Sequence, residues 1–213
     1  LATDDDVLKL NTPSGTCGEG ASRCVLGSGT GLGLAYICAT KTGAYIQRTH
    51  GGHMLPSALQ QDHQEMFGSV QKFKASPSAI IYEDILSGPG IMNVYKILSG
   101  KSHTFADEYR ATNDLIARGR NNPLVQETLR LYHEILGIFA HQAVAFGCAY
   151  RGVYLTGGIT DRLMSNNLFD NATFEKYFKQ RNVQAVRKDV DATPTFWIKD
   201  EYIALKGLLE VPA

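Results

Sequence analysis

The first pattern in the chain is a pair of short apolar runs on either side of a stretch in which glycine recurs at every second position. Residues 24–27 enter this stretch and residues 34–38 leave it, and the second run contains β-branched and aromatic side chains. Such runs are typical of strands. A third run, residues 44–49, follows Gly43. Because short strands joined by tight turns form a meander, we expect three antiparallel strands here.

Beyond residue 60 the apolar positions recur at intervals of three and four residues, which indicates helices. Met66, Val70 and Phe73 follow this spacing, and segment 124–150 repeats it on a broad apolar face that includes Phe146. The later expected elements are helices 61–73, 91–98, 105–118, 124–150, 174–180 and 201–209, and strands 152–156 and 195–199. A meander followed by alternating helices and strands predicts an α/β fold, a mixed five-stranded sheet with helices on its faces.

The glycine-rich stretch suggests a phosphate site. Gly29, Thr30 and Gly31 form its centre, where glycine lets backbone N–H groups approach an anion with no Cβ in the way. The dinucleotide fingerprint needs a helix and a third glycine, where this chain has leucine, and the P-loop needs a Gly-Lys-Ser/Thr that is absent. The sequence therefore predicts a β-hairpin whose tip binds phosphate, with an ordinary glycine-rich hairpin as the alternative.

Composition narrows the classes of function. The 213 residues suffice for one domain with a sizeable core, and 21 Lys and Arg residues balance 21 Asp and Glu residues. This zero net charge argues against a nucleic-acid or membrane-surface partner. No apolar run approaches the roughly 20 residues of a membrane span, and no signal-peptide pattern opens the chain. We therefore expect a cytoplasmic protein.

Four motifs in a fixed order carry a family resemblance. They are G-x-G-T-G-L-G at 27–33, G-G-H at 51–53, E-x-x-L-S-G-P-G at 83–90, and an apolar strand that ends in T-G-G-I at 156–159. This order resembles bacterial-type glucokinase, a family of the actin-like sugar kinases, whose two RNase-H-like lobes close over ATP and sugar. The resemblance runs from about Val25 to the last expected helix. It implies that phosphate passes from ATP, with Mg²⁺, to the 6-hydroxyl of glucose.

The resemblance also implies roles for the glycine motifs. Gly29, Thr30 and Gly31 would bind the β- and γ-phosphates, and Gly157 and Gly158 would lie where the family places its adenosine motif. A strand that ends in two glycines lets a nucleotide lie close against the backbone. A plain strand-to-helix turn is the alternative for this second pair.

By the same resemblance, His50, His53 and Glu83 fall on sugar-contacting positions. A carboxylate such as Glu83 can accept hydrogen bonds from two adjacent hydroxyls. The family usually has glutamate where this chain has His50, and an imidazole offers one fewer acceptor and no fixed negative charge. This departure bears on the affinity for glucose and on the choice of sugar.

A metal site held by side chains is not expected. His50 and His53 have an H-x-x-H spacing that zinc sites use, but no further ligand cluster lies near them in the sequence. The other histidines, at 63, 103, 133 and 141, show no metal-ligand spacing. We expect them at surface positions or as hydrogen-bonded core residues.

The resemblance covers only part of the family's fold. The family's first lobe carries an Asp-x-Gly-Gly-Thr hairpin and an Asn-Asp pair whose Asp is the catalytic base, and neither motif occurs here. Residues 1–213 would then form the second lobe, without a catalytic residue, and segment 201–213 would pack on the first lobe. The expected partners are glucose, that first lobe and a second copy in a homodimer. The alternatives are a non-catalytic sugar-binding or regulatory relative and another kinase of the same superfold.

Overall fold

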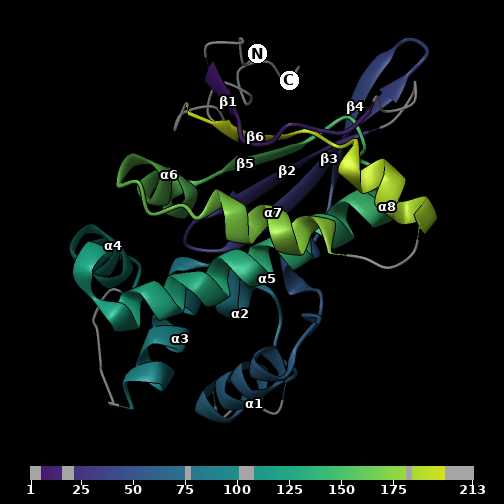
Figure 1. The fold of residues 1–213 in the computed structure, drawn as a ribbon. Helices are drawn as coiled ribbons and strands as arrows, with labels where there is room; N and C mark the ends of the chain where they lie inside the picture. The colour runs from purple at the N-terminus through teal and green to yellow at the C-terminus, as the bar shows by residue number, and fades with distance from the viewer. Residues whose placement is uncertain (1–5, 16–21, 75–77, 101–107, 181–183, 200–213) are drawn as a thin grey trace, which may run out of the picture.

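The centre of the molecule is a mixed six-stranded sheet (Figure 1). The computed structural model describes residues 6–15, 22–74, 78–100, 108–180 and 184–199. The strands are β1 Val7–Lys9, β2 Arg23–Ser28, β3 Leu32–Thr40, β4 Gly43–Arg48, β5 Val153–Thr156 and β6 Thr195–Ile198. They lie side by side in the order β1-β6-β5-β2-β3-β4.

The pairing of the strands confirms the expected meander and corrects the expected strand count. Strands β2, β3 and β4 pair antiparallel in sequence order, whereas β2 pairs with β5, and β5 with β6, in parallel. The sixth strand is β1, which adds to β6 in the antiparallel sense. Its three residues are too few for an alternating pattern, and two of them, Leu8 and Lys9, are exposed, so the sequence carries no signal for this strand.

The helices of the described residues lie on one side of the sheet (Figure 1). They are α1 Gln61–Lys74, α2 Glu83–Leu86, α3 Gly88–Ser99, α4 Glu108–Arg118, α5 Pro123–Gly147, α6 Gly158–Ser165, α7 Asn171–Lys179 and α8 Gln184–Asp191. Helices α2 and α8 were not expected from the sequence, and α6 was foreseen only in the alternative of a strand-to-helix turn at Gly157 and Gly158. The expected helix 201–209, which we placed against another lobe, lies outside the described residues. None of the helices in the described ranges is long and apolar enough to cross a membrane.

Helix α5 crosses beneath the sheet and contributes much of the core. Asn122 caps its start by accepting from the N–H groups of Leu124 and Val125. Near its end, the hydroxyl of Tyr36 on β3 donates to the carbonyl of Ala143 at 2.9 Å, which fixes the helix to the sheet.

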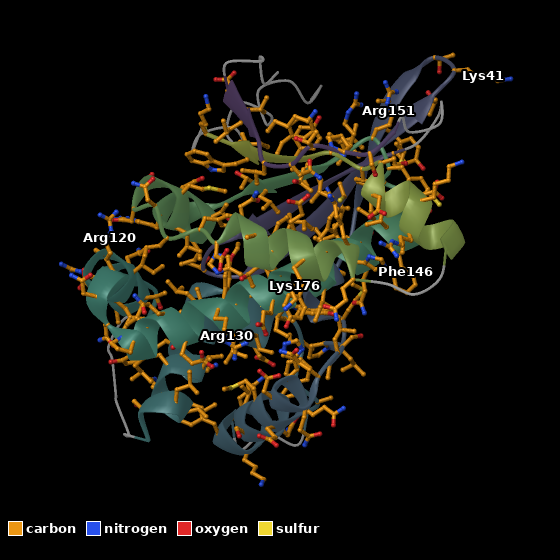
Figure 2. All side chains as sticks on the ribbon, viewed as in Figure 1. Lys41, Arg120, Arg130, Phe146, Arg151 and Lys176 are labelled. Atoms are coloured by element: carbon orange, nitrogen blue, oxygen red, sulfur yellow. The ribbon has the colours of Figure 1, made fainter. Side chains whose placement is uncertain are left out.

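The expected apolar face of α5 is confirmed except at its last turn. Phe146 is 79% exposed and lies at the edge of the molecule (Figure 2). It stands two residues beyond the buried Val144. At 3.6 residues per turn, this offset places its side chain on the opposite side of the helix.

Candidate functional site

The hairpin tip and the turn after β5 leave the sheet side by side. Gly27 on β2 is in register with Thr156 on β5, so the residues that follow each strand emerge at the same edge. A Cβ on Gly157 would lie 2.4 Å from the carbonyl oxygen of Ser28, and a Cβ on Gly29 would lie 3.9 Å from the backbone nitrogen of Gly158. The structure therefore brings together the two glycine motifs that the sequence singled out. Their contacts with a nucleotide stay a prediction.

This edge of the sheet presents backbone N–H groups to a ligand. Gly29 donates to the carbonyl of Gly31 across the tip at 2.9 Å. Among the described residues, the N–H groups of Thr30 and Gly31 have no protein acceptor. Helix α6 begins beside them at Gly158, and its N-cap residue, Gly157, supplies no side-chain cap. Uncapped helix N-termini and exposed turn N–H groups both favour anions, so the arrangement suits phosphate.

Glu83, an expected sugar ligand, is hydrogen-bonded to the hairpin. Its Oε2 accepts from the N–H of Leu32 at 2.8 Å, and a Cβ on Gly31 would lie 2.8 Å from the same oxygen. The N–H of Gly88, at the start of α3, donates to the carbonyl of Gly29 at 2.8 Å. The segment that carries Glu83 is thus attached to both sides of the hairpin tip. No sequence pattern indicates this link, because it joins residues that lie 51 positions apart.

His50 and His53 lie on a turn packed against the start of β3. Their rings are exposed, with centroids 5.9 Å apart. The two glycines between them are buried, and a Cβ on Gly52 would lie 2.1 Å from the carbonyl oxygen of Leu32. The turn also adjoins the Glu83 segment, since the carbonyl of Met54 accepts from the residue before Glu83 at 3.0 Å. The three expected sugar residues are therefore gathered around the start of β3.

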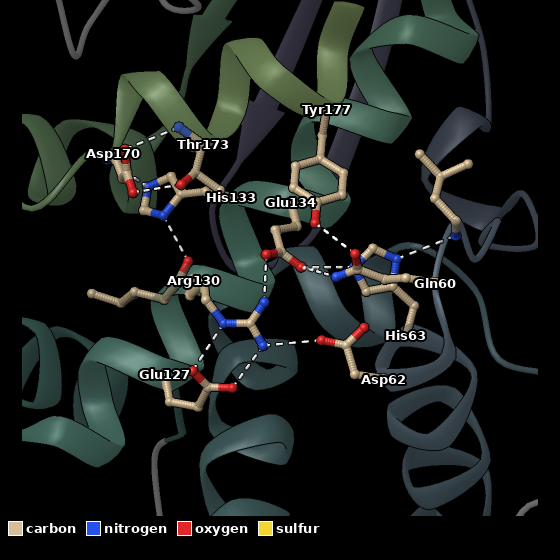
Figure 3. A network of polar contacts seen from close by, with 12 residues as sticks. Gln60, Asp62, His63, Glu127, Arg130, His133, Glu134, Asp170, Thr173 and Tyr177 are labelled. Carbon is tan, nitrogen blue, oxygen red and sulfur yellow. Dashed lines mark hydrogen bonds and ion pairs between the residues drawn. The ribbon is translucent and has the colours of Figure 1, made fainter. Parts of the chain in front are cut away.

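A second polar cluster joins α1 to α5 away from these motifs (Figure 3). Potential ligand atoms of Asp62, His63 and Glu134 lie within 4.8 Å of one another, and His63 Nε2 contacts Glu134 Oε2 at 2.7 Å. Arg130 pairs with Glu134, with Asp62 at 3.1 Å and with Glu127 at 2.7 Å. The guanidinium supplies the positive charge that these carboxylates need, so we assign no metal to this cluster.

The electrostatics of the cluster agree with a structural ion-pair network. The hydrogen bond from Arg130 holds the pKa of Glu127 below its ordinary value. Burial alone would raise the pKa of Asp62, but its hydrogen bond with Arg130 and the neighbouring His63 lower it overall. No sequence pattern indicates this cluster, because His63 and Glu134 lie 71 residues apart on different helices.

Comparison with known proteins identifies the family. A sequence model of the glucokinase family matches residues 1–211. The chain belongs to the glucokinase family. This match confirms the resemblance carried by the four motifs. All four, including both glycine turns and the Glu83 segment, lie within the matched residues.

Curated relatives give the extent of the similarity. The chain is 30% identical to the glucokinase of Brucella melitensis biotype 1 over 192 aligned residues. The alignment covers 88% of this chain and 53% of that protein. It is 28% identical to the glucokinase of Hahella chejuensis over 196 aligned residues, and this alignment covers 90% of this chain and 58% of that protein. The chain therefore spans about half the length of these two glucokinases.

Solved structures show the same fold. The glucokinase from an Antarctic psychrotroph superposes with a TM-score of 0.78 at 22% identity, over 98% of this chain and 62% of that one. The glucokinase of Balamuthia mandrillaris, crystallised in complex with glucose, gives a TM-score of 0.72 at 21% identity, over 92% of this chain and 56% of that one. The expected α/β fold is thus confirmed, and these two solved glucokinases share it.

Proposed function

We propose that this chain is the second lobe of an ATP-dependent glucokinase, which transfers the γ-phosphate of Mg²⁺·ATP to the 6-hydroxyl of glucose. The observation that supports this most is the meeting of three motifs at one edge of the sheet. The hairpin tip lies beside Gly157 and Gly158, and the Glu83 carboxylate is bonded to the hairpin at Leu32. The site for the phosphate donor and the site for the sugar would then both be formed around the hairpin of β2 and β3.

The nucleotide would bind through backbone groups of this edge. The N–H groups of Thr30 and Gly31 and the start of α6 would hold the phosphates, and Gly157 and Gly158 would lie against the adenosine. A Cβ built on Gly29 would lie 3.9 Å from the backbone nitrogen of Gly158, so a ligand held by the hairpin tip would also lie beside the start of α6. Mg²⁺ neutralises charge on the phosphate oxygens during transfer and would be held mainly by those oxygens.

The sugar would bind beside the start of β3. Glu83 Oε2 already accepts from Leu32 N–H, so Oε1 is the oxygen more accessible to a sugar hydroxyl. His53 and His50 would complete the site from the neighbouring turn. His50 stands where the family usually has glutamate. This substitution favours a second candidate function, that of a relative that binds a different sugar or binds sugar without phosphorylating it.

The proposal includes a first lobe as the partner of this chain. That lobe would supply the catalytic Asp and close over ATP and glucose, and the intact enzyme would be a cytoplasmic homodimer. None of the carboxylates in the described part of the site stands in for the base, because Glu83 is committed to the hairpin and to sugar. General-base catalysis contributes about 10²- to 10⁴-fold to a rate, and lobe closure adds further to it.

The test combines a coupled assay with a binding measurement on the 213-residue chain. We expect Mg²⁺·ATP to bind in isothermal titration calorimetry, and we expect no turnover of glucose comparable with that of an intact sugar kinase. A chain that binds no nucleotide would contradict the proposal. Rapid turnover would contradict the placement of the base in a first lobe. Titration with glucose and with other hexoses distinguishes the second candidate, which predicts tighter binding of another sugar.

A further inference from the structure

A buried hydroxyl lies beneath the two glycine turns. Tyr132 on α5 is 1% exposed, and within the described part of the chain its hydroxyl oxygen has no hydrogen-bond partner. Buried side-chain hydroxyls are nearly always hydrogen-bonded, because desolvation without a partner is unfavourable. Burial also raises the pKa of Tyr132 to about 12, so the group stays protonated and keeps a hydrogen to donate.

The neighbours of this hydroxyl come from the two turns of the proposed nucleotide site. The side chains of Ser28 and Thr160 lie beside it, although neither meets it with hydrogen-bond geometry. Ser28 is the last residue of β2 before the hairpin tip, and Thr160 lies in the first turn of α6. Both side chains are themselves buried.

One link of a hydrogen-bond chain is already formed here. Ser28 Oγ donates to the carbonyl of Leu86 at 2.5 Å, at the end of the helix that begins with Glu83. A hydroxyl that donates once still has lone pairs with which to accept. Ser28 can therefore accept from Tyr132 without giving up its bond to Leu86, which would connect α5 through β2 to the Glu83 segment.

We propose that Tyr132 is a positioning residue of the nucleotide site, whose hydroxyl donates to Ser28 Oγ when phosphate occupies the hairpin tip. This inference rests on the proposed function. The bond ties α5 to the end of β2, directly before the hairpin tip, and so holds the tip in the position that the phosphates require. The unpartnered hydroxyl of the ligand-free chain is satisfied only in the bound state.

Tyr132→Phe tests this proposal because it removes one oxygen and leaves the ring in place. Without ligand the variant loses an unsatisfied buried group, so its Tm should rise by about 2–4 °C. With Mg²⁺·ATP it lacks the bond that forms on binding, so its Kd should rise by about 5- to 10-fold. An ordinary structural hydrogen bond predicts the opposite pair of results, a lower Tm and an unchanged Kd.

Tyr177→Phe is the matched control. The Tyr177 hydroxyl donates to Gln60 Oε1 at 2.9 Å, in the cluster that joins α1 to α5 (Figure 3). Because this bond is already formed in the ligand-free chain, its loss should lower the Tm and leave the Kd for Mg²⁺·ATP unchanged. Calorimetric titration and thermal unfolding of the three chains supply all the data.

The outcomes separate this inference from the function on which it rests. If the wild-type chain binds Mg²⁺·ATP and Tyr132→Phe binds it equally well, the positioning role is wrong and the proposed function stands. A fall in Tm for Tyr132→Phe like that of the control also overturns the positioning role. If the wild-type chain binds no nucleotide, the proposed function fails and this inference fails with it.

Discussion

Gly29 at the hairpin tip and Gly157 in the turn after β5 differ in how much space surrounds them. Gly157 has a φ of 97°, and any Cβ there would lie 2.4 Å from a backbone oxygen of Ser28, which cannot swing aside. For Gly29, the nearest atom to a Cβ is the backbone nitrogen of Gly158, at an ordinary 3.9 Å. The fold therefore requires glycine at 157, whereas at 29 it would accept a methyl group.

Substituting each glycine by alanine should separate stability from binding. Gly157→Ala adds left-handed strain and a backbone clash, so we expect it to lower the free energy of unfolding by about 2 kcal/mol or more. Gly29→Ala should change that free energy by less than about 0.5 kcal/mol, yet weaken Mg²⁺·ATP binding because its methyl group would lie at the tip where the proposed phosphates approach the backbone. Urea unfolding and calorimetric titration measure the two effects. Wild-type affinity in Gly29→Ala would count against a phosphate at the tip.

At the scale of elements, sequence reasoning succeeded where the signal was local. Helix α5 was expected at 124–150 and spans Pro123–Gly147, because the spacing of its apolar residues can be recognised within one continuous segment. The cluster of His63 and Glu134 was not foreseen, because only packing of α1 against α5 brings the two together. Strand β1 was missed for a related reason, since it exists by pairing with β6 near the other end of the chain.

The contact between α5 and α7 contains a titratable group whose neighbours define its protonation state. His133 on α5 is buried, and its Nε2 accepts from the N–H of Asp170, the N-cap of α7, at 3.3 Å. Its Nδ1, which then carries the proton, donates to the carbonyl of Leu129 at 2.6 Å. Burial lowers the pKa of His133 to about 4, against the opposing effects of Leu129 and the Asp170 charge. The neutral ring is thus part of how α7 docks on α5.

This contact should make stability depend on pH in a defined window. The unfolded chain protonates His133 below its ordinary pKa of 6.5, whereas the folded chain does so only near pH 4. Because the unfolded state binds more protons between these values, the free energy of unfolding should fall as the pH falls from 6.5 to 4, by up to about 3 kcal/mol. Urea unfolding at several pH values measures the slope.

Two histidine variants show whether His133 causes this pH dependence of the free energy of unfolding. His133→Gln cannot titrate in this window, so its stability should change much less between pH 6.5 and 4.5 than that of the wild type. His50→Gln removes an exposed imidazole and should keep the wild-type slope. Equal slopes in His133→Gln and the wild type would show that other groups govern the acid response.

At the scale of the whole molecule, the sheet determines where a ligand can bind. Strands β2 and β5 run parallel as neighbours, and in open α/β sheets the crevice outside the carboxyl ends of the strands is the usual ligand site. The four motifs carried the resemblance that singled out both glycine turns, and the structure brings these turns together at this edge. The motifs could not predict the bond from Leu32 to Glu83 or the hydroxyl of Tyr132 beneath the turns, because both depend on side-chain packing between distant segments.

The phosphate site is tested most directly by an amide-resolved NMR titration of the 213-residue chain with Mg²⁺·ATP. The largest shift changes should occur at Thr30, Gly31 and the first turn of α6. The turn between β3 and β4, at Lys41 (Figure 2), should not respond. Saturable changes confined to the hairpin tip and the start of α6 would support a phosphate site at this edge of the sheet. An unchanged spectrum, or largest changes elsewhere in the chain, would contradict it.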